Sequence, residues 1–239
     1  LAVHCRTVNG FFRGFGYPGI NELALVNDNH ICCSKTIQAP PTVRYIPNFI
    51  TGEEEESLLT QIYGAPKPKW QNLLNRRLQN WGGIVGKKAL VPDGNIPQWL
   101  TYVIDKLMSL GDSFPPENRP NHVLVNEYIP GQGIMAHTDG PAFYPMVATI
   151  SLGGDILLDY YKPLDPKKKK TVEERYMGSM LLQRRSLILF SDEAYTKCLH
   201  EIADRRIGEV VNRSLRVSLT IRNVRKVCKM STADLIAKR

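Results

Sequence analysis

The part of the chain that follows residue 121 constrains the fold most, because it is built almost entirely from apolar runs of strand length. Glycine, proline, aspartate or charged residues separate these runs, which is the pattern of short strands joined by turns. The expected strands lie at residues 122–129, 147–152, 155–161, 176–182, 186–190 and 214–222. Such a series predicts a β-sandwich or β-barrel in this part of the chain.

Two helices are expected upstream of these strands. Thr51 and Glu54 have the spacing of a capping box, which marks a helix N-terminus. A second helix is expected just after Pro97, because proline is tolerated at the first helical position and apolar residues then recur at helical spacing. A short strand at residues 43–46 precedes both helices. Helices first and strands after indicate an α+β chain.

The length of 239 residues suits one domain with short extensions. Residues 1–39 lack sustained periodicity, so we expect an N-terminal appendage that need not fold with the rest. Residues 40–226 are expected to form the folded domain, and residues 227–239 a basic C-terminal tail. Inside the domain, residues 162–175 hold four consecutive lysines. These charges repel one another and stay in water, which predicts an exposed insertion loop.

Charge and cysteine content limit the class of protein. Basic residues outnumber acidic ones by 31 to 23, for a net charge of +8, which favours an anionic partner. The five cysteines are an odd set without a C-x-x-C pair, which predicts reduced thiols rather than disulfides or a zinc site. No apolar run approaches the roughly 20 residues that span a bilayer, and no signal-peptide pattern opens the chain. We expect no membrane contact and a location in the cytoplasm and nucleus.

His137 and Asp139 form an H-x-D motif. On an extended backbone the two side chains face the same side, so an imidazole and a carboxylate could hold one metal ion together. About half of one such match is expected by chance in a chain of this composition, so the motif alone does not exclude an ordinary turn. Upstream, Asn126 and Tyr128 share one face of an expected strand, and a Pro-Gly turn is predicted to fold that strand back toward the motif as a hairpin.

The last expected strand alternates polar and apolar side chains, and its polar face carries Arg216, Ser218 and Arg222. In an isolated amphipathic strand such a face is turned to solvent. Two arginines roughly 20 Å apart along a strand could instead bracket a short dicarboxylate, because the planar guanidinium binds carboxylates bidentately. The residues alone leave both interpretations open.

Together, and in this order, the two motifs resemble those of AlkB-type iron(II)- and 2-oxoglutarate-dependent dioxygenases. The similarity runs from about Pro40 to Lys226. Residues 65–70, 78–83 and 135–141 look most like the sixth AlkB homologue of animals and plants. This resemblance implies a double-stranded β-helix, or jelly roll, with N-terminal helices packed on it. It also implies an enzyme that uses Fe(II), O₂ and 2-oxoglutarate as cosubstrate.

The resemblance further implies the iron ligands. His137 and Asp139 match the first two, and His200 takes the place of the third, because no other histidine lies downstream of His137. Three protein ligands leave positions for 2-oxoglutarate and O₂. The implied reaction hydroxylates a substrate C–H bond, and an N-methyl group hydroxylated in this way is lost as formaldehyde.

Five further residues are implied to hold the cosubstrate. By the same resemblance, Arg216 would pair with the distal carboxylate of 2-oxoglutarate, and Tyr128 would donate a hydrogen bond to it. Asn126 and Arg222 would contact the end of the molecule that binds iron. Ser218 stands where the family commonly has asparagine, and its shorter hydroxyl could act directly or through water.

Nucleic acid is the expected substrate, as single-stranded RNA or DNA. Cations interleaved with indoles precede the core, and single strands bind where cations meet phosphates and aromatic rings stack on bases. Pro141 stands where AlkB uses an acidic residue to contact a flipped base. Either the base is contacted differently, with Phe143 and Tyr144 stacking in compensation, or the substrate is not a small alkylated base. The candidate substrate residues are Trp70, Arg76, Arg77, Trp81, Phe143, Tyr144, Lys167, Lys168, Lys169 and Lys170. Alternatively, the indoles are core residues and the lysines only solvate the surface.

The favoured function is therefore a monomeric dioxygenase that hydroxylates or demethylates N-alkyl groups on nucleic acid. One alternative is a nucleic-acid or protein binding module on the same scaffold with little catalytic turnover. Another is a protein demethylase or hydroxylase. The complete set of metal-binding side chains and the two arginines favour the enzyme.

Overall fold

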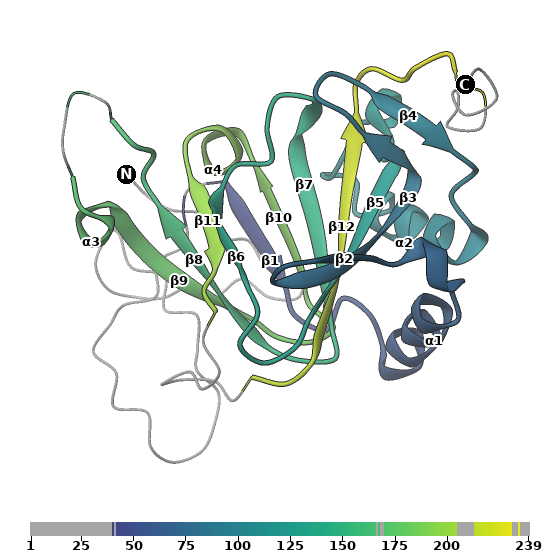
Figure 1. Ribbon diagram of the computed structural model, residues 1–239, viewed down its shortest axis with the longest axis horizontal. Helices are drawn as coiled ribbons and strands as arrows, with labels where there is room; N and C mark the ends of the chain where they lie inside the picture. Colours follow the sequence, from purple (N-terminus) through teal and green to yellow (C-terminus); the bar gives the residue numbers. More distant parts are fainter. Residues whose placement is uncertain are drawn as a thin grey trace.

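The computed structural model describes residues 40, 42–165, 167, 170–204, 213–230 and 234. These residues form two antiparallel β-sheets that face each other, with two helices on the outer side of one sheet (Figure 1). This is the predicted α+β jelly roll with its N-terminal helices packed on it. No helix in the described ranges is long and apolar enough to cross a membrane.

The large sheet has the strand order β1-β10-β7-β12-β5-β3-β2, with β4 attached to β3. Its strands are β1 (Val43–Ile46), β2 (Gln71–Leu73), β3 (Arg76–Val85), β4 (Leu90–Asp93), β5 (His122–Tyr128), β7 (Phe143–Leu152), β10 (Leu187–Ser191) and β12 (Arg216–Val224). The small sheet has the order β6-β11-β8-β9. Its strands are β6 (Ile134–His137), β8 (Ile156–Tyr161), β9 (Tyr176–Leu182) and β11 (Leu199–Ile202).

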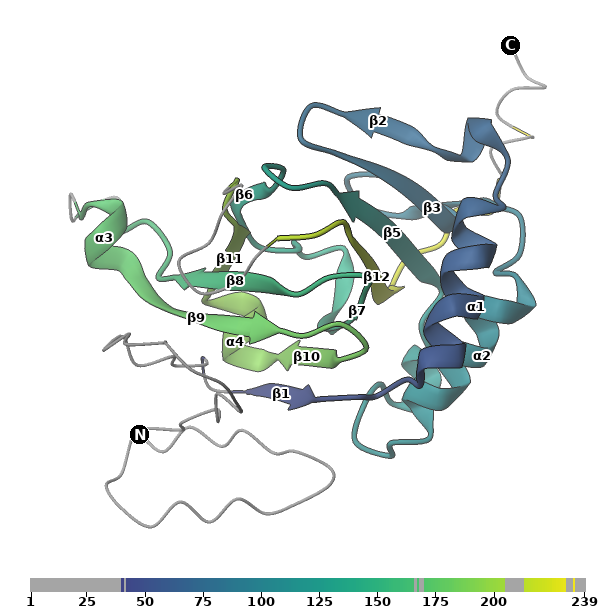
Figure 2. The ribbon, with the colours of Figure 1, turned by 90° about the horizontal axis from the view of Figure 1, so that it is seen from below.

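Both long helices lie on the outer face of the large sheet (Figure 2). They are α1 (Gly52–Tyr63) and α2 (Gln98–Met108). The predicted capping box opens α1, where the Glu54 amide donates to the Thr51 hydroxyl at 3.1 Å and the Thr51 amide donates to the Glu54 carboxylate at 2.7 Å. Pro97 is the N-cap of α2 rather than its first residue. Proline is tolerated at both positions, because neither needs a backbone N–H for the hydrogen bonds of the helix.

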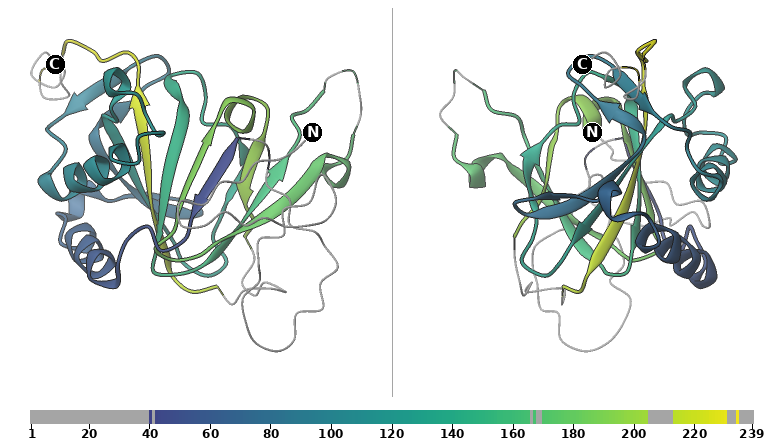
Figure 3. Two further views of the ribbon diagram at one scale, coloured as in Figure 1. Left: turned by 180° about the vertical axis from the view of Figure 1, so that it is seen from behind. Right: turned by 45° about the vertical axis from the view of Figure 1, so that its right-hand side comes forward.

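Short helical segments occupy several connections. They are α3 (Val172–Arg175), α4 (Asp192–Thr196) and the 3₁₀ turns Lys67–Lys69 and Pro116–Asn118. The helix α3 lies within the predicted insertion loop, at the edge of the small sheet far from α1 and α2 (Figure 3). Its N-terminus has a second capping box, formed by Thr171 and Glu174.

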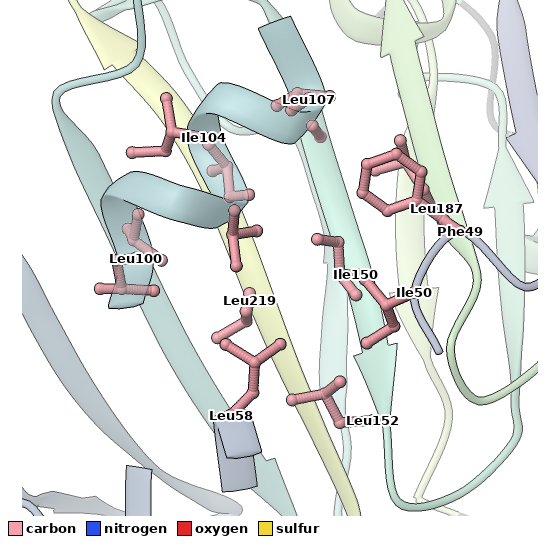
Figure 4. Close-up of a cluster of buried hydrophobic side chains, with 14 of the residues drawn as sticks. Phe49, Ile50, Leu58, Leu100, Ile104, Leu107, Ile150, Leu152, Leu187 and Leu219 are labelled. Carbon is pink, nitrogen blue, oxygen red and sulfur yellow. The ribbon is translucent and has the colours of Figure 1, made fainter. Parts of the chain in front are cut away.

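One hydrophobic core fills the space between the helices and the large sheet. Leu58 of α1 and Leu100 and Ile104 of α2 pack here with Ile150 of β7 and Leu219 of β12 (Figure 4). Successive side chains of a strand point to opposite faces. The polar face of β12 therefore points into the space between the two sheets, where a second core packs them together. It does not face solvent.

Five strands of the structure were not predicted, namely β2, β3, β4, β6 and β11. The predicted hairpin is wrong. Strand β5 pairs with β3 and β12, whereas β6 pairs with β11 in the other sheet. The turn itself forms, since the Gln132 amide donates to the Ile129 carbonyl at 3.0 Å. It carries the chain from the large sheet across to the small one.

A buried carboxylate fastens α1 to the turn between β7 and β8. Glu55 is fully buried, and it accepts hydrogen bonds from the Gly153 amide at 2.8 Å and from the Arg184 guanidinium at 2.6 Å. Glu55→Ala is expected to lower the free energy of unfolding by about 2 kcal/mol, because these donors lose a charged acceptor. The exposed neighbour Glu56 is the matched control, and its alanine variant should change stability by less than about 0.5 kcal/mol. Equal unfolding midpoints in guanidinium chloride would show that Glu55 does not fasten the helix.

Candidate active site

Two histidines from different segments lie side by side on the small sheet. His137 ends β6 and pairs directly with His200 of β11 across the antiparallel ladder, so both rings project from the same face. Their ring centroids are 4.3 Å apart. Asp139 follows two residues after His137, and its Oδ2 lies 3.8 Å from His200 Nε2. The fold thus brings together the three side chains that the sequence separates by up to 63 positions.

The surroundings of both imidazoles suit metal binding. The Nδ1 of His137 lies 2.8 Å from the Met135 carbonyl. Because a carbonyl only accepts, Nδ1 donates this hydrogen bond and Nε2 is the ring nitrogen left for a metal, the arrangement usual for a metal-binding histidine. Burial lowers the pKa of His200 to about 4, although the Asp139 carboxylate opposes the shift. His200 is therefore neutral at physiological pH, as metal binding requires.

One carboxylate oxygen of Asp139 accepts a hydrogen bond, and the other does not. Its Oδ1 accepts a hydrogen bond from Arg222 Nη1 at 2.7 Å, whereas its buried Oδ2 has no hydrogen-bond partner. A buried carboxylate oxygen without a partner is costly unless something binds it. Within the described part of the chain no group of three His, Cys, Asp or Glu side chains has closed to metal-coordinating geometry. The donor set nevertheless fits iron(II), since it joins two imidazoles to one free carboxylate oxygen.

A buried arginine faces this group from the large sheet. Arg216 is 2% exposed, and among the described residues no carboxylate pairs with it. Its Nη2 donates to the Ser151 hydroxyl at 3.0 Å, and its Nε has no partner. Burial lowers the pKa of Arg216 to about 10, so the guanidinium stays charged at neutral pH. Such a charge calls for an anionic ligand.

The strand register places the other predicted cosubstrate residues beside Arg216. Tyr128 lies directly across from Arg216, and Asn126 directly across from Ser218. Burial raises the pKa of the Tyr128 phenol, so its hydroxyl keeps the proton that it can donate. Arg76 Nε donates to the Asn126 amide oxygen at 3.1 Å, which leaves the amide N–H groups of Asn126 as donors.

These side chains line one cavity of about 250 Å³ between the two sheets. This volume lies just below the range of about 300–1,000 Å³ that is common for drug-sized ligands, so it suits a small metabolite. The polar residues in its wall are Arg76, Asn126, Tyr128, His137, Thr138, Asp139, Thr149, His200, Arg216, Ser218, Thr220 and Arg222. They include three guanidinium groups and a single carboxylate. The cavity therefore favours a small anion.

A profile of the "2OG-Fe(II) oxygenase superfamily" matches residues 66–222. The chain belongs to this superfamily. The matched segment includes both histidines and Asp139, together with the two arginines of β12. Membership of the 2OG-Fe(II) oxygenases implies iron(II) and 2-oxoglutarate, and the cavity has ligands for the first and cations for the second.

The relatives agree with the predicted resemblance. "Probable RNA/DNA demethylase ALKBH6" of Danio rerio is 45% identical over 212 residues, which cover 80% of this chain and 89% of that protein. "Uncharacterized protein L905" of Acanthamoeba polyphaga mimivirus is 29% identical over 192 residues, covering 76% and 84%. Among solved structures, "The structure of OsALKBH1" aligns with a TM-score of 0.58 at 15% identity, covering 78% of this chain and all of that one. This last likeness concerns the fold alone.

Several predicted substrate residues lie away from the cavity. Trp81 packs edge-on against Trp99 of α2 at 5.4 Å between ring centroids, so it belongs to the helix-side core. Tyr144 lies against Phe114 on that side as well. Phe143 is 5% exposed, and Arg222 covers its ring at 4.5 Å. Trp81 and Tyr144 are thus partly buried and Phe143 is buried, and the stacking of these three rings on bases stays a prediction.

Arg77 and Trp70 form a separate contact at the surface. The Arg77 guanidinium lies 4.1 Å from the Trp70 ring centroid and pairs with the buried Glu127 carboxylate. Arg76 instead lines the cavity between the two sheets that also contains Arg216. In the four-lysine run Lys167 and Lys170 are exposed, whereas Lys168 and Lys169 lie outside the described residues, as does the N-terminal segment 1–39.

A second cavity of about 530 Å³ adjoins the first and shares Leu124, Asp139 and Arg222 with it. It lies between β3 and the segment from Asp139 to Phe143. Sequence analysis missed it, because β3 was not predicted. His122, which belongs to no sequence motif, also lines this cavity. The only signal in the sequence was its position at the start of the strand that carries Asn126.

His122 is expected to make the protein sensitive to acid. Burial, helped by the positive charge of Arg222, lowers the pKa of His122 to about 3. Between pH 6.5 and 3 the unfolded chain binds a proton that the folded ring does not, so stability falls as the pH falls through this window. The loss from this residue is about 1.4 kcal/mol per pH unit.

Urea unfolding of the metal-free protein at pH 7, 6 and 5 measures this loss. In His122→Leu the free energy of unfolding should depend less steeply on pH, by the contribution of about one proton. An identical slope in the variant and the parent would contradict the assignment.

Proposed function

We propose that the chain is an Fe(II)- and 2-oxoglutarate-dependent dioxygenase that removes N-alkyl groups from nucleic acid by oxidation. The observation that carries the proposal is the placement of buried Arg216, which lacks a carboxylate partner among the described residues, in the wall that faces His137, Asp139 and His200. A metal-ligand set and a free buried cation in one small cavity are what a metal-chelating dicarboxylate requires.

The three ligand side chains would hold the iron through His137 Nε2, Asp139 Oδ2 and His200. The hydrogen bond that the Nδ1 of His137 donates to the Met135 carbonyl fixes the orientation of that ligand, and Arg222 does the same for Asp139. Such outer contacts orient ligands and raise metal affinity.

The cosubstrate would lie between the iron ligands and β12. Arg216 would bind its distal carboxylate, with Tyr128 donating a hydrogen bond to the same group. Asn126 and Arg222 would contact the end nearer the metal, and Ser218 would add a hydroxyl beside Asn126. All five side chains are at most 8% exposed, so these hydrogen bonds are shielded from water and correspondingly strong.

Iron and 2-oxoglutarate together activate O₂ and oxidise a substrate C–H bond when they are bound. The protein supplies a dry cavity, fixed cations and a fixed ligand orientation. If the oxidised carbon is an N-methyl group, the product loses formaldehyde and leaves the free amine.

Nucleic acid is proposed as the substrate on two grounds. The chain carries a net charge of +8, and such a balance supports binding to phosphates. The related protein of Danio rerio is named a probable RNA/DNA demethylase.

The test is succinate release together with mass spectrometry of methylated nucleosides, using single-stranded RNA and DNA with and without Fe(II). We expect iron-dependent succinate release and loss of a methyl mark, both abolished in Arg216→Met. Turnover of methylated peptides but not of nucleic acid would make the chain a protein demethylase. Binding of iron and 2-oxoglutarate without turnover of peptides or of nucleic acid would make the chain a binding module.

A further inference from the structure

The second cavity contains a buried histidine whose hydrogen-bonding capacity is only half used. His122 is 2% exposed. Its Nε2 lies 3.3 Å from Asn80 Oδ1, and its Nδ1 has no hydrogen-bond partner. Because the Asn80 oxygen only accepts, Nε2 carries the proton and Nδ1 presents a lone pair. A buried acceptor without a partner is costly in the free protein, and a ligand donor would remove that cost.

The remaining wall of the second cavity is mainly uncharged. Leu78, Leu124 and Ala142 give apolar surface, and Gln71 adds an amide. Pro141 also lines the cavity and offers no side-chain donor or acceptor. The wall thus combines apolar surface with a few neutral polar groups, which is how proteins bind uncharged heterocycles.

The charges of this cavity disfavour a cationic substrate such as a methylated lysine. Its single carboxylate, Asp139, is already paired with Arg222. Two cations, Lys87 and Arg222, line the cavity. Recognition of methyl-lysine requires open aromatic faces, whereas the Arg222 guanidinium lies over the ring of Phe143.

We propose that the second cavity receives the alkylated base and that Nδ1 of His122 accepts a hydrogen bond from an N–H group of that base. The shared wall formed by Leu124, Asp139 and Arg222 then sets the base beside the metal ligands. Asn80 acts as a positioning residue, because it fixes which ring nitrogen of His122 is the acceptor. Lys87 is exposed at the cavity and contacts phosphate. This inference rests on the proposed function, since it takes nucleic acid as the substrate.

The experiment compares short single-stranded oligonucleotides that differ only in one N-methylated base. Binding is measured by fluorescence anisotropy with Mn(II) and 2-oxoglutarate present, so that no turnover occurs. A panel of methylated adenines and cytosines in RNA and DNA identifies the base that the parent protein prefers. The preference is the ratio of the affinities for the modified and unmodified strands.

His122→Phe keeps a flat ring but removes the acceptor, and it is expected to reduce the preference at least about tenfold, toward one. His122→Gln keeps a neutral acceptor and should retain part of the preference. Lys87→Gln should weaken modified and unmodified strands alike, as loss of a phosphate contact does. The neighbouring Lys88 does not line the cavity, and Lys88→Gln is the matched control. Affinity for 2-oxoglutarate should be unchanged in all four variants.

An unchanged preference in folded His122→Phe would overturn the inference while leaving the proposed function intact. If that variant does not fold, Asn80→Leu serves in its place, because the ring of His122 then loses its fixed tautomer and the preference should fall. A parent protein that prefers no modified base, but oxidises a methylated peptide, would overturn the proposed function and this inference together.

Discussion

Arg216→Met is expected to raise the dissociation constant for 2-oxoglutarate about 30-fold or more. Removing one partner of a buried, hydrogen-bonded charge pair costs about 2–5 kcal/mol of binding, and 2 kcal/mol corresponds to about 30-fold. The same substitution should leave the stability of the free protein unchanged or increase it. Arg216 is buried with an unsatisfied Nε, and an uncompensated buried charge destabilises a fold.

Isothermal titration with 2-oxoglutarate and Mn(II), together with thermal unfolding, measures both effects. Arg119→Met is the control, because the side chain of Arg119 makes an exposed ion pair with Asp105, and exposed pairs contribute about 0–1 kcal/mol. Unchanged cosubstrate affinity in Arg216→Met would remove this residue from the site. Lost affinity with an equal loss of stability would assign it a structural role.

Asp139→Asn is expected to lower metal affinity at least about 100-fold. The amide is neutral, so the site loses its only anionic ligand, and Arg222 loses the carboxylate that Nη1 contacts at 2.7 Å. Changing a residue that merely orients a ligand already costs about 10–100-fold, so changing the ligand should cost more. Arg222→Met should lower metal affinity by about 10–100-fold.

Titration of the metal-free variants with Mn(II) gives these affinities, and Asp105→Asn is a control at an exposed carboxylate. The order of effects is part of the prediction. A larger loss in Arg222→Met than in Asp139→Asn would mean that the guanidinium, not the carboxylate, organises the site.

The sequence pattern predicted β12 well, but it could not decide where the polar face of the strand points. Arg216 and Arg222 alternate with apolar residues in the same way on a solvated strand and on a strand that lines a cavity. The decision depends on long-range packing, because α1 and α2 cover the face that carries Leu219. The family resemblance supplied the correct orientation.

The strands that carry His137 and His200 were the hardest to predict. Strands β6 and β11 have four residues each, and each includes a polar histidine. Their apolar runs are therefore too short to stand out from loops. The pairing of His137 with His200 is a tertiary contact that no local pattern contains. The hairpin prediction failed for the same reason, since a turn does not determine which sheet receives the next strand.

The structure partly buries two of the residues that were expected to bind substrate. Trp81 was expected to stack on bases because it lies among cations in the sequence, and Tyr144 because it lies close to Pro141. The structure packs both toward the helices instead. His122 and Asn80 were not predicted to belong to the site, because a lone histidine and a lone asparagine form no motif.

Anaerobic titration with Fe(II) in the presence of 2-oxoglutarate tests whether His137, Asp139 and His200 hold one iron, through the charge-transfer absorption that appears when the cosubstrate chelates bound iron. We expect one iron per chain in the parent protein and no such absorption in His137→Ala, Asp139→Ala or His200→Ala. Arg216→Met should bind iron normally and show the absorption only at much higher cosubstrate concentration. Undiminished absorption in His200→Ala would show that the two histidines and Asp139 do not hold one iron.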